Sequence, residues 1–575
     1  MAIDLFRRKS LDAILSVASD EKYTLKRSLG AFNVTLLGIG AIIGAGIFAT
    51  IGTAAAGDAS RPGAGPSLVV SFMITAAVSA LTALCYAEFA SMVPISGSAY
   101  TYSYATLGEL VAWIIGWDLI IEYAVGNVAV AISWANYFRT FLETAFGIHV
   151  PPWLSTDVRT AARIPGLLDH APHVLGVPIV FNLLAFAIVM IITLVLVWGI
   201  KESARFNAGM VIIKIIVLLF FVGAALYFVP SGSIVKNWTP FQPRGWGGTL
   251  AGAAVVFFAY IGFDAVSTVA EETRNPSRDL PIGIIASLAV STLLYVVVAA
   301  VFTGVMPYHE LVQRLATEQA EPLTMALDHV APTATWAAAF VAFGSVVAHT
   351  AVLLVFQLGQ PRIFFSMARD GLLPPTFAKV HPKFKTPYVP TIVTGLAVGG
   401  VAAFASIDEM VDLTNIGTLF AFVLVCIGIP ILRFTDPDRR RPFRVPFGPY
   451  LVPGLGMASC LFLMIYLPPA SWWRFVGWLA LGLAFYSSYG YCHSTLGREG
   501  GRPHKPPPVL KVLSGGLLAT SIGLFGMPHG VGLRGLVDAL MAGELRAVLG
   551  IGLTALGMSI TMVALAVARR SLASR

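Results

Sequence analysis

The stretch that decides the fold is Gly38-Ile39-Gly40-Ala41-Ile42-Ile43-Gly44-Ala45-Gly46-Ile47-Phe48, in the middle of an apolar segment. It holds four glycines within nine residues, and each glycine inside a helix costs about 1 kcal/mol relative to alanine. Close helix packing could explain Gly40 and Gly44, which are four residues apart. Adding Gly46 favours local unwinding, and unwound backbone at membrane depth is tolerated only beside a cavity or a bound molecule. We interpret the stretch as a binding element, with a packing seam as the alternative.

A second interrupted segment is Phe257-Phe258-Ala259-Tyr260-Ile261-Gly262-Phe263-Asp264-Ala265. An aromatic cluster, a glycine and a carboxylate break an otherwise apolar run there. The two interruptions occupy corresponding places in two five-span halves that run in opposite directions, and such pairs point to the binding site of a transporter. The N–H groups at the start of a half-helix suit a carboxylate.

The composition indicates an all-α integral membrane protein. The chain has 575 residues, of which 57% are hydrophobic and 12% are charged, whereas soluble domains carry about 25% charged residues. Apolar runs long enough to cross a hydrocarbon core of about 30 Å recur along the whole length. These runs are continuous rather than alternating, which excludes a membrane β-barrel.

The apolar runs predict fourteen membrane spans. Their approximate limits are 32–57, 67–92, 108–137, 179–199, 207–229, 249–271, 283–306, 334–361, 388–407, 413–433, 449–468, 474–493, 510–528 and 545–567. With both termini in the cytoplasm, 27 of the 38 lysines and arginines fall on the cytoplasmic side and ten on the other. This bias predicts a multi-pass protein of the cell membrane with that orientation. It also explains the net charge of +8 without a nucleic-acid partner.

The spans divide the chain into five parts. We predict a cytoplasmic N-terminal segment (1–31), a first inverted repeat of spans 1–5 (32–229), a second of spans 6–10 (249–433), peripheral spans 11–14 (449–567) and a cytoplasmic tail (568–575). The four cysteines lie in or beside apolar runs and show no metal-ligand or disulfide spacing. We therefore expect no metal site and no cofactor.

Three ionisable residues at membrane depth are candidates for function, because charges there are expensive. Lys214 could donate to carbonyl groups freed by the first interruption and carry a proton, or it could extend to the membrane interface. Glu122 and Asp264 could meet a substrate amine or a cationic side chain. For both carboxylates a hydrogen-bonded structural role is equally open.

His349, in the predicted span 334–361, is a further candidate. Histidine can titrate near neutral pH, so it could exchange a proton. The alternative, which we prefer, is that its ring shapes the wall of a pocket.

These residues belong to a recognisable pattern. The chain resembles the cationic amino acid transporter branch of the amino acid–polyamine–organocation superfamily. The matching segments are Gly38–Phe48, Phe257–Ile282, Leu358–Ile363 and Met367–Pro374. The second ends Ala-Glu-Glu-Thr-Arg-Asn-Pro-Ser-Arg-Asp-Leu-Pro-Ile, and the last contains Arg-Asp-Gly-Leu-Leu-Pro. The resemblance covers the chain from about residue 25 to 570.

The resemblance implies a leucine-transporter-like fold with discontinuous spans 1 and 6, alternating access and proton coupling. It assigns the substrate carboxylate to backbone groups of Ile42, Gly44, Ala45 and Gly46. It assigns the amino group to those of Phe258, Ala259 and Ile261, with Phe258 closing the site. Lys214 matches the lysine that replaces bound sodium in proton-coupled relatives, and Glu122 and Asp264 match acidic positions near the pocket.

Two departures from the family pattern concern the substrate. Ala45 removes a hydroxyl that relatives often have, and a bulky His349 beside the substrate side chain would disfavour arginine and lysine. A cationic and a small neutral amino acid both stay open. A small accessory membrane subunit also stays open, alongside the surrounding lipid.

Other functions agree less well with the sequence than amino acid transport does. A polyamine or nucleobase could use the same scaffold, but a polyamine lacks the carboxylate that the first interruption suits. An intramembrane enzyme would need a nucleophile–base pair or metal ligands, which the sequence does not offer. No Gly-x-x-x-x-Gly-Lys-Ser/Thr loop occurs, which argues against ATP as the driving force. An amino acid sensor that does not transport is the remaining alternative.

Overall fold

A computed structural model describes residues 6–9, 27, 29–58, 60–93, 98–163, 166–169, 171–174, 176–199, 204–317, 321–499, 506–525, 527 and 545–573. Most of these residues are helical. The strands in this part of the chain form two short antiparallel hairpins, β1 (Gly57–Asp58) with β2 (Arg61–Pro62) and β3 (His173–Val174) with β4 (Val177–Pro178).

The first half of the described chain, up to the second interruption, consists mainly of long apolar helices. In chain order its helices are α2 (Ala31–Ile42), α3 (Ala45–Phe48), α4 (Thr50–Ala56), η1 (Gly65–Ser67), α5 (Leu68–Met92), α6 (Ser98–Thr106), α7 (Glu109–Ile120), η2 (Ile121–Val125), α8 (Gly126–Phe146), η3 (Pro152–Leu154), α9 (Val158–Arg163), α10 (Leu183–Trp198), α11 (Ala204–Phe228), α12 (Ser233–Asn237) and α13 (Gly245–Val256). The turn η2 is π-helical.

The second half repeats this pattern of long helices joined by short ones. Its helices are η4 (Phe257–Tyr260), η5 (Asp264–Glu272), α14 (Pro276–Val305), α15 (Tyr308–Thr317), α16 (Pro322–Val330), α17 (Thr335–Arg369), η6 (Pro375–Ala378), α18 (Tyr388–Phe404), α19 (Ile407–Thr435), α20 (Leu451–Ile465), α21 (Pro469–Phe485), η7 (Tyr486–Gly490), α22 (Tyr491–His493), α23 (Thr495–Glu499), α24 (Pro508–Phe525) and α26 (Leu545–Ala573).

Nine helical segments in the described residues are long and apolar enough to cross a membrane. They are Gly65–Met92, Glu109–Phe146, Ala208–Phe228, Gly245–Ala270, Pro276–Val305, Thr335–Arg369, Ile407–Thr435, Pro508–Phe525 and Leu549–Ala566. The predicted multi-pass helical membrane protein is therefore confirmed. The other five predicted spans overlap three shorter apolar helices (α2, α10 and α18) and a pair, α20 with α21–α22, that is bent by 118°. The exact number of crossings stays a prediction.

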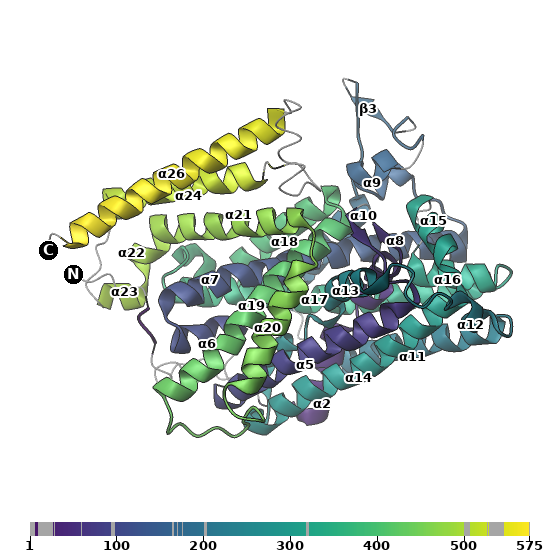
Figure 1. The fold of residues 1–575 in the computed structure, drawn as a ribbon, viewed down its shortest axis with the longest axis horizontal. Coiled ribbons are helices and arrows are strands. Elements are labelled where there is room, and N and C mark those ends of the chain that lie inside the picture. The colour runs from purple at the N-terminus through teal and green to yellow at the C-terminus, as the bar shows by residue number, and fades with distance from the viewer. Residues whose placement is uncertain are drawn as a thin grey trace.

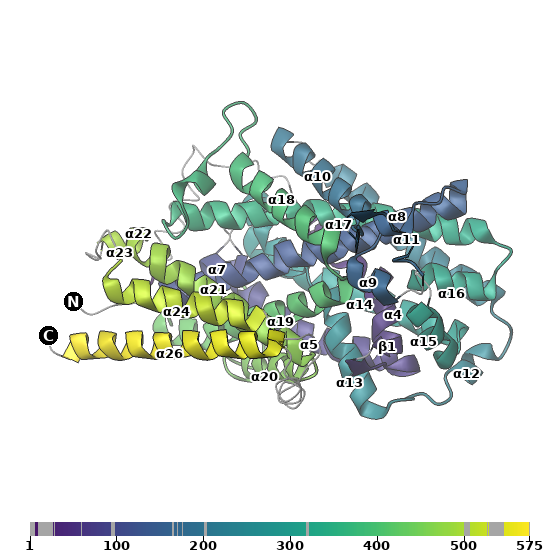
Figure 2. The same ribbon diagram turned by 90° about the horizontal axis from the view of Figure 1, so that it is seen from above.

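The helices surround a core in which α14 packs against α2 and α5, and α17 packs against α8 and α11. Helices α24 and α26 lie side by side on the outside, next to α21 (Figures 1 and 2). In both views α12, α15 and α16 lie at one end of the molecule, and α22 and α23 lie at the other. This arrangement suits a protein whose connecting segments emerge on two faces of a bilayer.

Helix ends follow local chemistry. Asn182 caps α10 by accepting a hydrogen bond from the N–H of Ala185, and that helix ends at Gly199 in the left-handed region, φ +77°. Helix α19 carries Asp408 and Glu409 in its first turn and Arg433 in its last. These charges complement the helix dipole at both ends.

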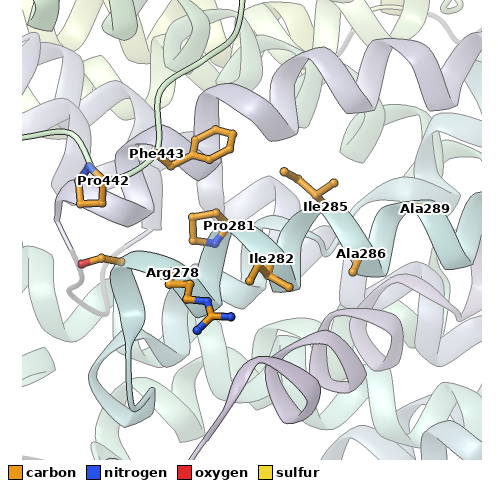
Figure 3. A pocket seen from close by; sticks show the side chains of 9 residues that line it. Arg278, Pro281, Ile282, Ile285, Ala286, Ala289, Pro442 and Phe443 are labelled. Carbon is orange, nitrogen blue, oxygen red and sulfur yellow. The ribbon is translucent and has the colours of Figure 1, made fainter.

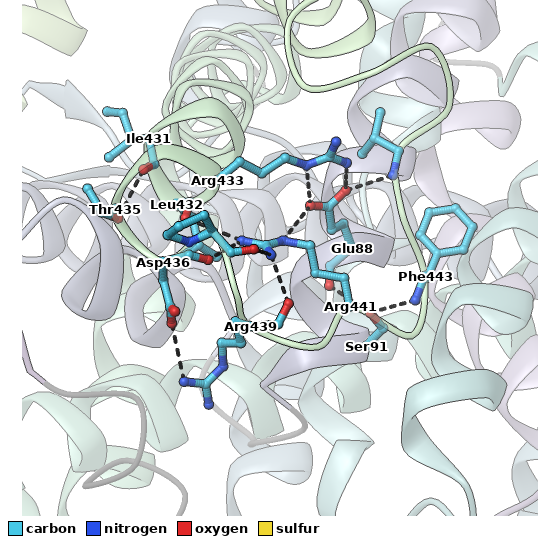
Figure 4. Close-up of polar contacts among 12 residues, drawn as sticks. Glu88, Ser91, Ile431, Leu432, Arg433, Thr435, Asp436, Arg439, Arg441 and Phe443 are labelled. Carbon is cyan, nitrogen blue, oxygen red and sulfur yellow. Dashed lines mark hydrogen bonds and ion pairs between the residues drawn. The ribbon is translucent and has the colours of Figure 1, made fainter.

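A buried carboxylate fixes the loop after α19. Glu88, on α5, is fully buried and accepts hydrogen bonds from Arg433 Nε at 3.0 Å and from Arg433 Nη2 at 2.5 Å. Its other contacts are the N–H of Val445 at 2.7 Å and Arg441 Nε at 3.7 Å. The N–H of Phe443 donates to Ser91 on the same helix (Figure 4). The loop is thereby clamped to α5.

We expect Glu88→Ala to lower the stability of the protein by about 3 kcal/mol, because removing one partner strands the buried charge of the other. Thermal unfolding of the purified protein in detergent measures the effect. Glu143→Ala serves as the control, since Glu143 pairs with His149 in an exposed contact that is worth at most about 1 kcal/mol. Equal effects of the two substitutions would contradict a structural role for Glu88.

Candidate functional site

The first predicted interruption is a break between two helices. Helix α2 ends at Ile42, and Ile43 is extended, with φ −76° and ψ 105°. Gly44 follows with φ −163° and ψ −141°, and α3 begins at Ala45. The first N–H groups of a helix have no partner within it, so the start of α3 presents N–H groups to whatever lies in front of it.

The second predicted interruption is also a break. Helix α13 passes into the tight turn η4, Ile261 is extended, and the chain resumes as η5 at Asp264. Gly262 has φ +117°, and a Cβ atom there would lie 2.8 Å from the carbonyl oxygen of Ala41. The break therefore requires glycine both for its conformation and for its contact with α2.

Glycines also bring the two broken spans together. A Cβ atom on Gly46 would lie 2.1 Å from the Cα of Ala259, and one on Gly44 would lie 2.7 Å from Val352 Cγ2. The glycines therefore serve close packing as well as unwinding, so the two interpretations of the stretch are not exclusive.

A small cavity lies between the two breaks. It is lined by Ala41, Ile42, Gly44, Ala45, Gly46, Val130, Phe258, Ile261, Val352 and Phe356. Every lining side chain is apolar, so backbone groups supply the polarity that this wall offers. The cavity volume is about 10 Å³, roughly the room that one water molecule needs, so the two breaks lie almost closed against each other and a ligand would have to separate them.

Six of the residues predicted to bind substrate line this cavity: Ile42, Gly44, Ala45, Gly46, Phe258 and Ile261. Ala259 packs behind it, against Gly46. The remaining predicted residues, Glu122, Asp264, His349 and Lys214, are buried but are not part of the lining. Their roles stay predictions.

Lys214 makes the contact that the sequence suggested. It is fully buried on α11, and its ammonium donates to the carbonyl oxygens of Gly40 at 2.5 Å and Ile43 at 2.9 Å. These are carbonyls at the broken end of α2. Because the side chain is fully buried where it meets these carbonyls, it does not extend to the surface of the molecule.

Glu122 and Asp264 are both buried. Tyr123, the neighbour of Glu122, donates to Asp264 Oδ2 at 3.2 Å. Glu122 and Tyr123 both belong to the π-helical turn η2, and π-helical turns are frequent at functional sites. Asp118, one turn earlier and also buried, has no hydrogen-bond partner for either carboxyl oxygen among the described residues.

Hydrogen bonds at both ring nitrogens hold His349 in place. Its Nδ1 lies 2.7 Å from the carbonyl oxygen of Ser345, so Nδ1 donates, and Nε2 accepts from the Ser133 hydroxyl at 2.7 Å. The ring packs against Phe48 and Tyr137, with centroids 5.7 Å away from each. Since Phe48 belongs to α3, the ring lies against that short helix.

Sequence reasoning missed two polar residues that satisfy the freed backbone. The Tyr295 hydroxyl lies 2.9 Å from the carbonyl oxygen of Ile42 and 3.0 Å from that of Ala259, bridging the two breaks. Asn415 Nδ2 donates to the carbonyls of Ala254 and Val255, just before the second break. Their signal was a polar side chain in the middle of a predicted span.

Ion pairs join the segment that follows α4 to helix α19. Arg61 Nε lies 2.8 Å from Asp58 Oδ2, and Arg61 Nη1 lies 2.5 Å from Asp412 Oδ1 in α19. Burial opposes ionisation of Asp58, but the guanidinium of Arg61 and the hydrogen bonds from Ser60 outweigh it and lower the pKa of Asp58. Arg474 and Arg159 both pair with Glu409, one turn earlier in α19.

A second set of contacts joins the residues before α2 to the rest. Lys9 Nζ lies 2.9 Å from Asp370 Oδ1, and Tyr100 donates to Asp370 Oδ2 at 2.7 Å. The N–H of Leu29 donates to the carbonyl of Glu272 and the N–H of Arg274 donates to that of Leu29, which form one parallel bridge. The bridge links the start of α2 to the end of η5.

Glu321 is a buried carboxyl in the segment that connects α15 to α16. Burial raises its pKa to about 7, against the opposing charge of Arg139 and a hydrogen bond from Asn136.

Residues 29–486 match the sequence profile of the family described as amino acid permease. The chain is 48% identical to a branched-chain amino acid permease of Bacillus subtilis over 86% of this chain and 99% of that protein. It is 44% identical to a methylthioribose transporter of the same organism, over 86% and 99%. It is 36% identical to a vacuolar cationic amino acid transporter of Arabidopsis thaliana, over 76% and 68%.

We expect Gly46→Ala to destabilise the protein by about 2 kcal/mol or more and to abolish ligand binding, because its Cβ would push α3 away from η4. Gly209→Ala is the matched control. A Cβ there meets nothing within 4 Å, and alanine inside a helix is favoured over glycine by up to about 1 kcal/mol. Thermal unfolding with and without ligand measures both variants, and a tolerated Gly46→Ala would refute the close approach.

The raised pKa of Glu321 predicts a pH dependence of stability. The folded state binds this proton more tightly than the unfolded state, whose pKa is near 4.5. Its contribution is therefore full below pH 4.5 and is lost, by up to roughly 3 kcal/mol, as the pH rises to about 7. Glu321→Gln should flatten the fall in melting temperature over this range. Glu143→Gln, at an exposed site, should show the same fall in melting temperature as the wild type. An identical fall with pH in the wild type and in Glu321→Gln would contradict a raised pKa of Glu321.

Proposed function

Because the chain belongs to the amino acid permease family, we propose that it carries a small neutral amino acid across the cell membrane through the cavity between α3 and η4. The observation that carries the proposal is that two broken spans meet at one cavity lined by apolar side chains. Transport would proceed by alternating access. The relatives are described as permeases and transporters, and the protein is not an enzyme.

The lining of the cavity favours a neutral aliphatic substrate over a cationic one. Val130, Val352 and Phe356 complete a wall without a charged side chain. A lysine or arginine side chain would be buried there without a partner, at a cost of several kcal/mol. A branched aliphatic side chain would instead gain about 0.8 kcal/mol for each buried methylene group. The similarity to the branched-chain amino acid permease agrees with this choice.

Each break would bind a different charged group of the amino acid. The carboxylate would lie at the start of α3, where Ala45 and Gly46 present N–H groups and the helix dipole favours an anion. The ammonium would meet the carbonyl groups of Phe258, Ala259 and Ile261. The Tyr295 hydroxyl has one hydrogen for two carbonyl oxygens. A substrate ammonium could therefore replace it at Ala259.

A second candidate is a neutral metabolite without this zwitterion. The similarity to the methylthioribose transporter is the specific observation in its favour. Such a ligand fits an apolar cavity but leaves the start of α3 without an anion.

The proposed topology has fourteen spans. The three short apolar helices and the bent pair α20–α22 would supply the five crossings beyond the nine long segments. Residues 32–229 and 249–433 would form two inverted repeats of a leucine-transporter-like core, with both termini in the cytoplasm. Spans 11–14 would be peripheral, which agrees with the outer position of α24 and α26.

The proposed driving force is the proton gradient, with Lys214 as the coupling group. Its ammonium donates to Gly40 and Ile43 at the end of α2, next to the residues that would bind substrate. Loss of the proton would remove the charge from these hydrogen bonds and weaken the tie between α11 and α2. Proton occupancy and the geometry of the substrate site would thereby be linked.

Uptake of radiolabelled amino acids into liposomes tests the proposal. We expect an inward proton gradient to stimulate uptake of valine, leucine or isoleucine, and not of lysine or arginine. Lys214→Ala should reduce the stimulated uptake about tenfold or more, the equivalent of roughly 1.5 kcal/mol for a lost hydrogen bond to a charged group. Lys236→Ala, on the exposed loop helix α12, should leave uptake unchanged.

Each other outcome decides a part of the proposal. Uptake that ignores pH would refute proton coupling and leave transport in place. Competition by methylthioribose with no uptake of amino acids would favour the second candidate. Binding of an amino acid without uptake would favour a sensor.

A further inference from the structure

A large groove runs along the outer side of α14, away from the cavity between the broken spans. It has a volume of about 510 Å³ and follows α14 from Ser277 to Ala289. Pro442 and Phe443 form its opposite side (Figure 3). The volume lies within the roughly 300–1,000 Å³ of ligand pockets, so the groove can hold a molecule larger than an amino acid.

The groove runs from the headgroup region into one leaflet of a bilayer. Ser277 and Arg278 precede the predicted span 283–306, whereas Ile285 and Ala289 lie inside it. The seven steps from Ile282 to Ala289 correspond to about 10 Å at 1.5 Å per residue, within the roughly 15 Å of half a hydrocarbon core. Ile282 and Ile285, which line the groove, are 41% and 38% exposed. An acyl chain lying along α14 would cover them.

A positive charge stands at one end of this apolar surface. Arg278, Ile282 and Ala286 lie four residues apart and share one stripe of α14. The side chain of Arg278 is exposed, and it forms no ion pair with any described residue. Arg444, directly after Phe443, is also exposed. The groove is thus complementary to an anionic lipid, with a positive charge for the headgroup and an apolar surface for an acyl chain.

The opposite wall is a built part of the fold rather than a loose loop. Glu88 and Ser91 on α5 accept hydrogen bonds from the backbone N–H groups of Val445 and Phe443 (Figure 4). Arg441 holds the same loop through the carbonyl oxygens of Leu432 and Asp436. Phe443 is therefore presented to the groove in a fixed position.

We propose that this groove binds one anionic phospholipid of the cytoplasmic leaflet. One acyl chain lies along α14 between Ile282 and Phe443, and the phosphate contacts Arg278. A basic side chain next to an anionic headgroup contributes binding energy at the membrane surface. The leaflet follows from the proposed topology, whereas lipid binding itself does not depend on the transported substrate.

Native mass spectrometry of the purified full chain tests the site. The protein is titrated with phosphatidylglycerol and with phosphatidylcholine that carry identical acyl chains. We expect one phosphatidylglycerol to be retained in preference to phosphatidylcholine. Arg278→Ala should lower this retention about fivefold, the usual weight of one interfacial basic residue. Ala286→Phe should abolish it by filling the groove.

Arg274→Ala is the matched control. Arg274 is exposed four residues before Arg278 and does not line the groove, so the substitution changes the net charge equally and should leave retention unchanged. Unaltered thermal unfolding without added lipid checks the fold of each variant. The proposal is overturned by equal retention of both lipids, by equal effects of the two arginine substitutions, by retention in Ala286→Phe, or by a sterol or protein in the groove.

Discussion

The structure depends on one constraint, which is that no backbone polar group can be left without a partner in hydrocarbon. A continuous helix meets this constraint through its own hydrogen bonds, but at the two breaks some backbone groups have no partner within a helix. Side chains of other helices compensate for this. Lys214 and Tyr295 donate hydrogen bonds to carbonyl oxygens at the end of α2, and Asn415 donates to carbonyl oxygens before η4. Tyr137 likewise donates to the carbonyl of Phe48. Four helices are thereby tied to the two breaks, and the cavity between the breaks is possible only because of these ties.

This division of labour explains how one family can carry different molecules. In the proposed mode of binding, the backbone at the breaks would contact the groups that all amino acids share, while Val130, Val352 and Phe356, which line the cavity, would contact the side chain that varies. Replacing lining side chains changes the preferred ligand without altering the backbone that supports them. Relatives described for branched-chain amino acids, cationic amino acids and methylthioribose are all consistent with such exchange on one scaffold.

The sequence predicted the breaks well and the directions of side chains poorly. Glycine spacing marked Gly44 and Gly46, and an unexplained buried charge marked Lys214, because both signals are local. Depth in a span did not reveal that Glu122 and His349 lie off the cavity wall. Whether a side chain reaches the cavity depends on its direction around the helix axis. The π-helical turn η2, which contains Glu122, holds one more residue than an α-helical turn and so changes that direction. Tyr295 escaped notice because its partners are far away in sequence.

The bridge between Leu29 and Thr273 has a mechanical consequence. It consists of two backbone hydrogen bonds, at 3.0 Å and 2.8 Å, that join the start of α2 to the end of η5. Gly46 and Ala259 lock the same two spans together on the far side of the breaks. Because the two broken spans are in contact at both places, they cannot tilt independently. A tilt of α2 must be accompanied by the same tilt of η5, or the two hydrogen bonds, worth about 1 kcal/mol each, must break first.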